Sequence, residues 1–353
     1  MAFLSIPHIV IRGIAACVPP PSGIDENDKY PLPAEDVEKL ISTIGVERKR
    51  VSGKTTCCSD LCLAAAERLI SDLGWQKAEI EYLVFVSQTP DYITPATACV
   101  LQHRLGLGVG CMAFDVNLGC SGWVYGLSVL SALVAQGRGK GLILAGDTLS
   151  KFISKEDKST WPLFGDAGSA TAVEYAEGEP GFKFHLASDG DGQKAIWIKD
   201  GGYRHPVSEE SFVSRTFGNG ICHNDLQLVL DGMSVFSFGI SRAPESVNQL
   251  LEHFEIDKET VDFYTFHQAN LFMNEKIRKK LRLPMEKVPY SLRNFGNTSG
   301  ATIPLTLVSE LNRRLSSSRS THIGCAFGVG LSWGSVYFET DHIVCPELVE
   351  YEL

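Results

Sequence analysis

Segments typical of β-strands and segments typical of helices take turns along almost the whole chain. Apolar runs of strand length alternate with longer runs whose apolar residues recur at helical spacing, which predicts an α/β fold. Strands are predicted at 8–19, 81–89, 111–118, 141–149, 168–176 and 261–268, with two more around a glycine turn within 321–339. Helices are predicted at 60–74, 97–107, 122–139, 234–254, 270–281 and 302–315.

The same order of segments occurs twice. A turn cluster, GEPG at 178–181, divides the chain nearly in half, and the alternation resumes after it. Two halves of like order predict an internal duplication, with an N-terminal half at 1–177 and a C-terminal half at 178–353. The first segment, 1–14, is predicted to be a strand and not a signal peptide, because no basic stretch precedes its apolar residues.

Charge and cysteine content exclude several kinds of protein. The formal net charge of −10 argues against non-specific binding to nucleic acid. No window reaches about 18 uninterrupted apolar residues, so no membrane span is expected. The ten cysteines are scattered through apolar runs and form no C-x-x-C pair. This pattern predicts reduced thiols in a cytoplasmic protein, with no metal site and no cofactor.

One cysteine differs from the others in its neighbours. Cys120 lies within Gly119-Cys120-Ser121-Gly122, where a strand runs through a tight turn into a helix. Such a turn is typical of a nucleophile elbow, in which glycines let a substrate approach closely. Free amides at a helix N-terminus favour a thiolate, and such positions can lower a thiol pKa from about 8.5 into the range of roughly 3.5–7.5. A packed core cysteine is the other interpretation, and the local sequence leaves both open.

Two later segments contain side chains that could assist a thiolate. His267 ends an apolar strand, and Asn270 opens the next helix, within FYTFHQAN. The loop NFGNTSGATIP then places four polar residues among glycines before another helix: Asn294, Asn297, Thr298 and Ser299. Taken alone, the histidine could be structural and the loop an ordinary turn and helix N-cap.

A glycine-rich segment near the C-terminus, CAFGVGLSWG, places Gly328 and Gly330 in a predicted hairpin. Its G-x-G pattern, like GLGVG at 106–110, invites a dinucleotide-binding interpretation. Neither pattern leads into a helix, which that interpretation requires. A hairpin whose backbone amides approach a substrate fits better.

Cysteine, histidine and asparagine in this order also occur in papain-like proteases. In those proteases the cysteine lies near the mature N-terminus of a secreted enzyme, whereas a full α/β half precedes Cys120. The context therefore argues against a protease.

Together the segments resemble the beta-ketoacyl-acyl carrier protein synthase III family of the thiolase-like superfamily, over nearly the whole chain. STIGVERKR is similar to the family's N-terminal T-G-I-x-x-R element, AFDVNLGCSG to its nucleophile segment, and LFGDAGSATAV to its F-G-D-G-A-G-A strand. HQAN, GNTSGATIP and FGVGLSWGS are similar to its remaining signatures. The resemblance implies a duplicated thiolase-like α/β fold in five layers, α-β-α-β-α, usually assembled as a homodimer.

The resemblance also implies an acyltransferase of the 3-oxoacyl-acyl carrier protein synthase type. Cys120 would take an acyl group from acyl-coenzyme A or acyl carrier protein and hold it covalently. His267 and Asn297 would donate hydrogen bonds to the thioester oxygen of malonyl-acyl carrier protein and stabilise the enolate that decarboxylation leaves. The enolate carbon would then attack the acyl-cysteine in a Claisen condensation. The backbone amides of Cys120 and Val329 would form a second oxyanion hole, which requires a negative φ at Val329, where the family usually has glycine.

The chain departs from the family where coenzyme A would bind. Well-studied members stack the adenine between a tryptophan and an arginine, and these places hold Lys39 and Thr43. Phe272 stands in place of another arginine, and Asp157-Lys158 in place of an Asp-Arg pair. Since stacking contributes about 1–3 kcal/mol per base in nucleic-acid systems, coenzyme A should bind weakly. We therefore expect the acyl group to arrive on acyl carrier protein or another carrier.

Three further features concern what the site would bind. Lys276, Lys279 and Lys280 share one basic helix, part of which matches the family's docking surface for the acidic carrier protein. Thr94 stands where members restricted to acetyl primers have a phenylalanine, so a longer or branched acyl group is expected, and its loop typically reaches into the partner's pocket. The long segment 196–212 would either cover the mouth of the tunnel or form a surface loop.

The sequence leaves an alternative activity open. The same cysteine, histidine and asparagine could transfer the acyl group to a hydroxyl or an amine in a specialised pathway. A degradative thiolase would need a second catalytic cysteine. Cys325 lies near the right region for one, but HQAN and GNTSG favour the decarboxylating type.

Overall fold

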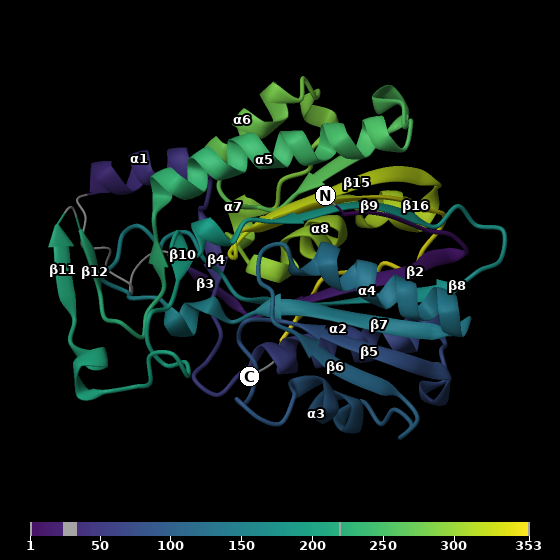
Figure 1. Ribbon diagram of the computed structural model, residues 1–353, viewed down its shortest axis with the longest axis horizontal. Helices are drawn as coiled ribbons and strands as arrows, with labels where there is room; N and C mark the ends of the chain where they lie inside the picture. Colours follow the sequence, from purple (N-terminus) through teal and green to yellow (C-terminus); the bar gives the residue numbers. More distant parts are fainter. Residues whose placement is uncertain (1, 24–33, 219, 352–353) are drawn as a thin grey trace.

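Two β-sheets form the centre of the molecule, for which a computed structural model describes residues 2–23, 34–218 and 220–351 (Figure 1). The six-stranded sheet has the order β17 (Val349–Glu350), β2 (Ile9–Val18), β8 (Ala167–Tyr175), β7 (Lys140–Asp147), β5 (Ile80–Val86) and β6 (Met112–Val116). The five-stranded sheet has the order β1 (Ala2–Ile6), β9 (Phe182–Ser188), β16 (Ser332–Thr340), β15 (Ser320–Gly328) and β14 (Phe263–Phe266).

Helices separate and cover the two sheets. On the outer face of the six-stranded sheet lie α2 (Cys58–Leu73) and α3 (Thr97–Arg104). The outer face of the five-stranded sheet is covered by α5 (Gly232–His253), with α6 (Leu271–Lys280) beside it. Between the sheets lie α4 (Gly122–Gly137) and α8 (Thr302–Ser317), while α1 (Ala34–Ile44) and α7 (Leu292–Phe295) are peripheral (Figure 1). The predicted α/β fold and its five-layer order α-β-α-β-α are confirmed.

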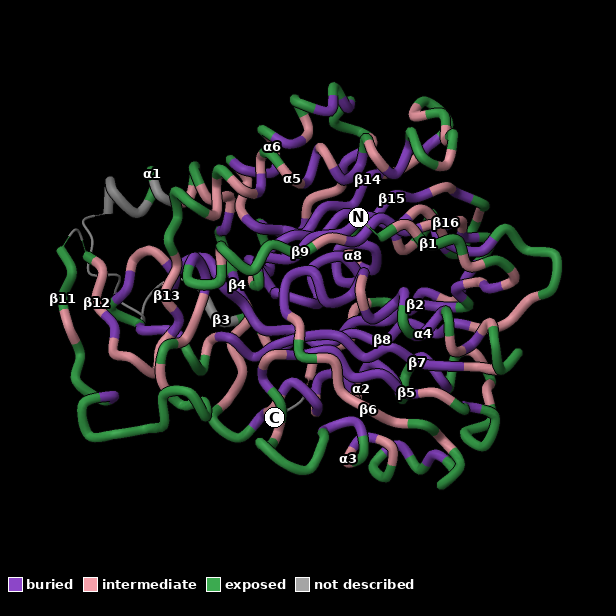
Figure 2. Tube along the Cα trace, in the orientation of Figure 1, coloured by how far each residue is buried: buried purple, intermediate pink, exposed green. Residues whose placement is uncertain are grey.

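The position of α4 explains its sequence. A helix that is apolar on all sides is typical of a buried environment, and α4 contacts strands of both sheets. Trp123 and Leu127 are buried there, and the Trp123 ring lies 6.0 Å from that of Phe338 in the opposite sheet. Figure 2 shows buried residues concentrated in the strands and in the helices between them. This central layer holds the turn that begins at Cys120.

The N-terminal segment differs from the prediction of one strand over 1–14. It forms two strands, β1 and β2, which belong to different sheets. Pro7 lacks a backbone N–H, and His8 has a φ of 63°, so the chain turns between them. At the other end of the chain, β17 pairs with β2. Thus β1, from the predicted N-terminal half, pairs with β9 of the C-terminal half, and β17, from the C-terminal half, pairs with β2 of the N-terminal half. The division at residue 178 stays a prediction.

Short ribbons extend the molecule at one end. The pairs are β3 (Pro21–Gly23) with β4 (Arg48–Arg50), β10 (Ile196–Trp197) with β13 (Val229–Leu230), and β11 (Arg215–Gly218) with β12 (Ile221–His223). Much of this extension lies in the long connection between β9 and α5, at the left of Figure 1. Within the described residues, no helix combines the length and apolar character needed to cross a membrane.

Candidate active site

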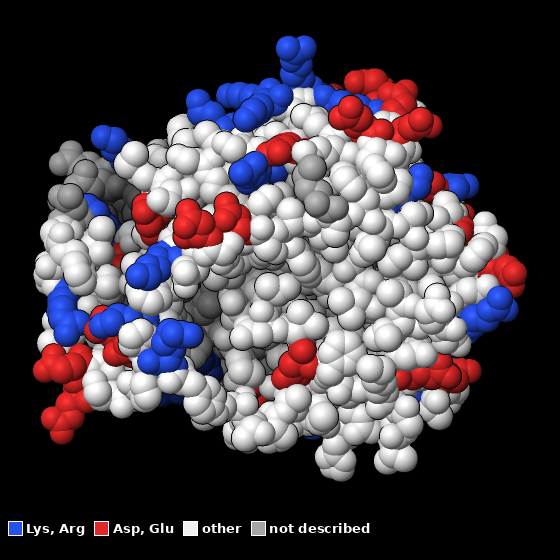
Figure 3. All heavy atoms as spheres, in the orientation of Figure 1, with Lys and Arg blue, Asp and Glu red and all other residues white. Residues whose placement is uncertain are grey.

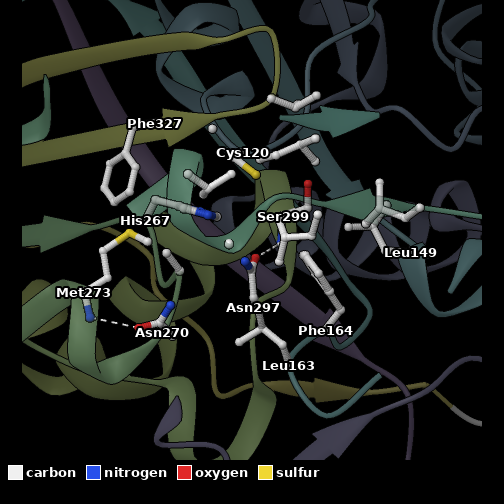
Figure 4. Close-up of a pocket in the computed structure, with 18 of the residues that line it drawn as sticks. Cys120, Leu149, Leu163, Phe164, His267, Asn270, Met273, Asn297, Ser299 and Phe327 are labelled. Carbon is white, nitrogen blue, oxygen red and sulfur yellow. Dashed lines mark hydrogen bonds between the residues drawn. The ribbon is translucent and has the colours of Figure 1, made fainter. Parts of the chain in front are cut away.

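The three predicted catalytic side chains meet in one pocket. Cys120 lies in the turn before α4, His267 directly follows β14, and Asn297 lies in the loop after α7 (Figure 4). The pocket has about 660 Å³ of space, including the part open to solvent, which is typical of small-molecule sites. Most of the other lining side chains are apolar: Leu149, Leu163, Phe164, Ile196, Leu228, Leu230, Val235, Ala269, Met273, Phe327 and Val329.

The hairpin between β15 and β16 closes over Cys120. A Cβ placed on Gly328 would lie 2.3 Å from the Cys120 Cβ and 2.7 Å from its Sγ, so this position requires glycine. The backbone N–H groups of Val329 and of Cys120 itself act on Sγ and lower the thiol pKa. Val329 is not among the residues with positive φ, so its side chain is compatible with the donor position that the family usually gives to glycine.

The turn before α4 does not lower the Cys120 pKa overall. Burial raises the pKa of the thiol to about 11, the Val329 N–H lowers it, and the Asp147 carboxylate raises it. This upward shift of the thiol pKa is worth roughly 3 kcal/mol. A helix N-terminus typically contributes about 0.3–1 kcal/mol in favour of an anion, which is too little to offset the burial. Cys120 is therefore a protonated thiol at neutral pH.

His267 is a neutral imidazole in a fixed orientation. Burial lowers its pKa to about 3, and a hydrogen bond to the Ser299 carbonyl raises it. Its Nδ1 lies 2.8 Å from the Thr302 Oγ1, and its backbone N–H donates to the Cys325 carbonyl at 2.8 Å. The Phe327 ring packs edge-on against the imidazole, with 5.5 Å between the ring centroids. These contacts place the ring at the wall of the pocket.

Asn297 is oriented by the residues that follow it. Its Oδ1 accepts the Ser299 N–H at 2.9 Å, the bond drawn as a dashed line in Figure 4. Because the amide oxygen is occupied, the Nδ2 hydrogens remain for a ligand in the pocket. The backbone N–H of Asn297 donates to the Leu163 carbonyl at 2.8 Å. The side chain is therefore a fixed hydrogen-bond donor, and unlike histidine it does not ionise.

The raised thiol pKa gives a pH dependence that can be measured. Because the protonated form is favoured, the thiolate fraction of Cys120 should rise about tenfold per pH unit from pH 7 to about pH 10. We expect the rate of iodoacetamide labelling of Cys120, followed by peptide mass spectrometry, to rise in the same proportion. Labelling of the exposed Cys99 in the same digest reports the amount of active reagent. A Cys120 rate that levels off below pH 8 would contradict the burial argument.

The positions that resemblance associates with adenine hold no tryptophan and no arginine. Lys39 and Thr43 are exposed on α1. Phe272 is 48% exposed and stacks on Phe236, with 5.4 Å between the ring centroids. Asp157 is buried and accepts hydrogen bonds from the backbone and hydroxyl of the nearby Ser159, so it stabilises its own turn. Among these positions, Phe272 is the exposed apolar side chain.

Other predicted site residues lie outside the pocket. Thr94 is exposed in the loop before α3 and is not part of the pocket lining of this single chain. Of the long segment 196–212, Ile196 lines the pocket, whereas Tyr203 and Phe212 are 92% and 63% exposed. The start of that segment therefore belongs to the pocket wall, and much of the remainder is surface.

The three candidate docking lysines are exposed on α6. Figure 3 shows Lys and Arg side chains gathered along the upper edge of the molecule, where α6 lies in Figure 1. Lys276, Lys279 and Lys280 are exposed. The neighbouring Arg278 is instead paired with Glu275 at 2.7 Å, and its side chain is 13% exposed. Its role is therefore to fix the helix end.

The remaining thiols do not contribute to the pocket. All ten cysteines are free. Cys325 is buried in β15, where its Sγ lies 3.7 Å from the Ala243 carbonyl oxygen on α5, and it does not line the pocket. In the part of the chain that the structure describes, no group of three or more His, Cys, Asp or Glu side chains could hold a metal ion.

Three polar residues around the site make contacts that the sequence did not predict. Ser299 has a φ of 52°, its hydroxyl lowers the Cys120 pKa, and its backbone contacts Asn297. Thr302 contacts His267, and Asp147 is fully buried at the end of β7 near Cys120. In the sequence, the serine and threonine resemble ordinary turn and capping residues. For Asp147, the one available indication of a role in the site was its position at the end of an otherwise apolar strand.

Comparisons with known proteins agree with this geometry. Residues 114–190 match the family described as 3-Oxoacyl-[acyl-carrier-protein (ACP)] synthase III, and residues 251–340 match its C-terminal counterpart. A protein from Campylobacter jejuni named putative 3-oxoacyl-[acyl-carrier-protein] synthase 3 is 31% identical over 345 residues, which cover 97% of this chain and 96% of that protein. A beta-ketoacyl-[acyl-carrier-protein] synthase III from Clostridium perfringens is 32% identical over 318 residues, which cover 89% and 94%.

A solved structure extends the likeness to the whole fold. The crystal structure of a 3-oxoacyl-(acyl-carrier protein) synthase from Burkholderia xenovorans has a TM-score of 0.91 and 37% sequence identity, and the match covers 99% of each chain. Sequence and structure thus agree from one end of the chain to the other. The chain belongs to the beta-ketoacyl-[acyl-carrier-protein] synthase III family of the thiolase-like superfamily and is a condensing enzyme of the acyltransferase type.

Proposed function

We propose that Cys120 accepts an acyl group from a carrier-bound thioester, and that the acyl group then undergoes decarboxylative Claisen condensation with malonyl-acyl carrier protein. The observation that supports this most directly is the meeting of Cys120, His267 and Asn297 in one apolar pocket. A thiol, a neutral imidazole and an amide donor are the groups that such a reaction needs.

In the acylation step, the Cys120 Sγ attacks the thioester carbonyl carbon. The developing oxyanion would accept hydrogen bonds from the backbone N–H groups of Cys120 and Val329, which lie beside Sγ. The bond between the carbonyl carbon and the carrier sulfur then breaks, and the thiol proton ends on that sulfur. Gly328 leaves the room above Sγ that an acyl group would need.

In the condensation step, the malonyl carboxylate leaves as carbon dioxide and its electron pair forms an enolate. The Nδ2 hydrogens of Asn297 would stabilise the enolate oxygen. The enolate carbon attacks the acyl carbonyl, the bond to Sγ breaks, and the Cys120 thiolate takes up a proton. Transfer to a hydroxyl or an amine is not favoured, because the relatives that match most of the chain are named as condensing enzymes.

The entrance favours a protein-bound acyl donor over free acyl-coenzyme A. Lys39 and Thr43 provide no aromatic ring for an adenine, and Phe272 already stacks on Phe236. A phosphopantetheine arm on acyl carrier protein would need the tunnel but no adenine site. The donor is therefore proposed to be acyl carrier protein or another carrier.

Intact-mass measurement tests the donor and the reaction together. The protein is offered the same acyl group on coenzyme A and on acyl carrier protein, and the rate at which the Cys120 adduct forms is compared. Malonyl-acyl carrier protein is then added, and we expect it to discharge the adduct. Faster loading from coenzyme A would overturn the proposed donor. No adduct from either donor, or discharge by alcohols and amines alone, would overturn the proposed function.

The exposed lysines of α6 are proposed to dock the acidic carrier protein. We expect a variant with Lys276→Glu, Lys279→Glu and Lys280→Glu to raise the KM for acyl carrier protein at least about tenfold, because attraction becomes repulsion. The difference from wild type should shrink above 0.1 M salt, where the Debye length falls below about 10 Å. Lys77→Glu, in the short helix η1 (Lys77–Glu79) before β5, is the matched control. An unchanged KM in the triple variant would exclude α6 as the docking surface.

A homodimer and a cytoplasmic location complete the proposal. Thr94 is exposed in this chain and does not line its own pocket. In a homodimer, its loop would instead reach the pocket of the second copy. There its small side chain would leave space for a longer or branched acyl group. Ten free thiols support a reducing compartment. Sedimentation of the purified protein tests the dimer.

A further inference from the structure

Ser121 follows the nucleophile and occupies the N-cap position of α4, yet its side chain does not cap the helix. A serine at this position ordinarily accepts a hydrogen bond from a backbone N–H of the first helical turn. Instead, the Ser121 Oγ lies 2.6 Å from the Oγ of Ser332 in β16. Both residues are buried, with exposed fractions of 0% and 3%. The two hydroxyls therefore join the nucleophile turn to the five-stranded sheet.

A third group fixes the direction of these hydrogen bonds. The Ser332 Oγ lies 2.8 Å from the carbonyl oxygen of Val329, and a carbonyl oxygen can only accept a hydrogen bond. A hydroxyl has one hydrogen to donate, so Ser332 donates it to Val329. The Ser332 oxygen must then accept the hydrogen of Ser121. We call this sequence of bonds, from Ser121 to Ser332 to the Val329 carbonyl, the serine relay.

The serine relay ends on the hairpin that lies over Cys120. The backbone of Ser332 is held within β16, which pairs with β15 on one side and with β9 on the other. A Cβ on Gly328 would lie 2.7 Å from the Cys120 Sγ, so the hairpin and the nucleophile are in contact. Val329 lies between Gly328 and Gly330, and glycine backbones adopt many conformations. A bond to the Val329 carbonyl therefore restricts the segment whose N–H faces Sγ.

We propose that Ser121 and Ser332 are positioning residues: the serine relay holds the hairpin so that the Val329 N–H stays directed at the carbonyl oxygen of the acyl group on Cys120. Neither serine lines the pocket, so neither touches the substrate. Their contribution is preorganisation, because an oxyanion donor is most effective when it is in place before the charge develops. The inference deepens the proposed acylation step and rests on it, since the role of Val329 in the oxyanion hole belongs to that proposal.

The rate at which acyl-acyl carrier protein acylates Cys120 tests the serine relay. Breaking either link disconnects the turn from the hairpin, so we expect Ser121→Ala and Ser332→Ala each to acylate about tenfold more slowly at saturating donor. This is a part of the loss of about 10²–10³-fold that removal of a whole oxyanion donor causes. Because the links act in series, the double variant should be no slower than either single variant, whereas two independent losses would multiply to about a hundredfold.

The concentration of donor that gives half the maximal rate should stay at its wild-type value, because the relay lies away from the entrance. Ser332→Thr keeps the hydroxyl and should recover most of the rate. Ser128→Ala on α4 and Ser335→Ala on β16 are the matched controls. These serines are similarly buried, and they bond to the Tyr125 carbonyl and to the Ser246 hydroxyl instead of the hairpin. Both controls should keep the acylation rate.

The infrared spectrum of the acyl-enzyme reports the hydrogen bond to the acyl oxygen itself. Each protein is loaded with an acyl group that carries carbon-13 at its carbonyl, and isotope difference locates the thioester band. We expect the band at higher frequency in Ser121→Ala and Ser332→Ala than in wild type, because a weaker hydrogen bond to the oxygen leaves a stronger C=O bond.

Three results would overturn the inference: a wild-type acylation rate in Ser332→Ala, a double variant whose loss is the product of the two single losses, or a thioester band that does not move. If Ser332→Ala does not fold, the rate and the band of Ser121→Ala decide. Failure of wild type to form any acyl adduct would instead overturn the proposed function.

Discussion

Replacing Cys120 with alanine is expected to abolish the acyl-enzyme adduct and to lower the condensation rate by about 10⁶-fold, the scale seen when a covalent nucleophile is deleted. The structure offers no substitute, because Cys325 is buried in β15, contacts α5 and does not line the pocket. Intact-mass measurement after incubation with acyl-acyl carrier protein detects the adduct, and product formation from malonyl-acyl carrier protein gives the rate.

The same variant separates the two halves of the reaction. Cys120→Ala leaves Asn297 and its bond to Ser299 in place, so slow release of carbon dioxide from malonyl-acyl carrier protein should persist. Cys325→Ala is the matched control: it removes an equally buried thiol and should lose stability but keep the adduct. Acylation of Cys120→Ala at another cysteine would show that Cys120 is not the nucleophile.

Replacing Asn297 with aspartate is expected to slow decarboxylation by about 10²–10³-fold while acylation of Cys120 continues. The aspartate retains the oxygen that accepts the Ser299 N–H at 2.9 Å, so the loop should keep its shape. It removes the amide hydrogens and places a negative charge where the enolate oxygen develops. Loss of one preorganised donor to an oxyanion has this magnitude in other enzymes.

Carbon dioxide release and adduct formation are measured separately on this variant. Asn294→Asp is the control, because Asn294 is exposed in α7 and the same change in charge occurs three residues away. We expect it to leave both rates near those of wild type. Equal slowing of acylation and decarboxylation in Asn297→Asp would indicate general damage to the site, and an unchanged rate of carbon dioxide release would show that the amide is not the donor.

Much of the fold was predictable because periodicity is local. The helix predicted at 60–74 is α2, which ends at Leu73, followed by Gly74 with a φ of 64°. The two strands predicted around the glycine turn are β15 and β16. The strand predicted over 1–14 was wrong, because its first half pairs with β9 in the other sheet. A strand pattern shows which face is apolar, but it does not name the partner strand.

The candidate site was predictable in its residues and not in its environment. Cys120, His267 and Asn297 each lie in a recognisable sequence motif. Resemblance to a family indicated that the three side chains act together in catalysis. The roles of Ser299 and Thr302 were not visible, because serine and threonine before a helix are common caps. Their contacts depend on the backbone φ of one residue and on the position of His267, which comes from another strand.

The sequence by itself determined the α/β order, because the periodicity of apolar residues is local. It also named the three catalytic candidates, through motifs that resemble those of the family. Only the tertiary structure decided the protonation states of Cys120 and His267. Gly328, from the far half of the chain, closes over Cys120. Burial raises the pKa of the Cys120 thiol to about 11, and burial of His267 lowers its pKa to about 3. Desolvation arises from segments that meet only after folding, so no local pattern encodes it.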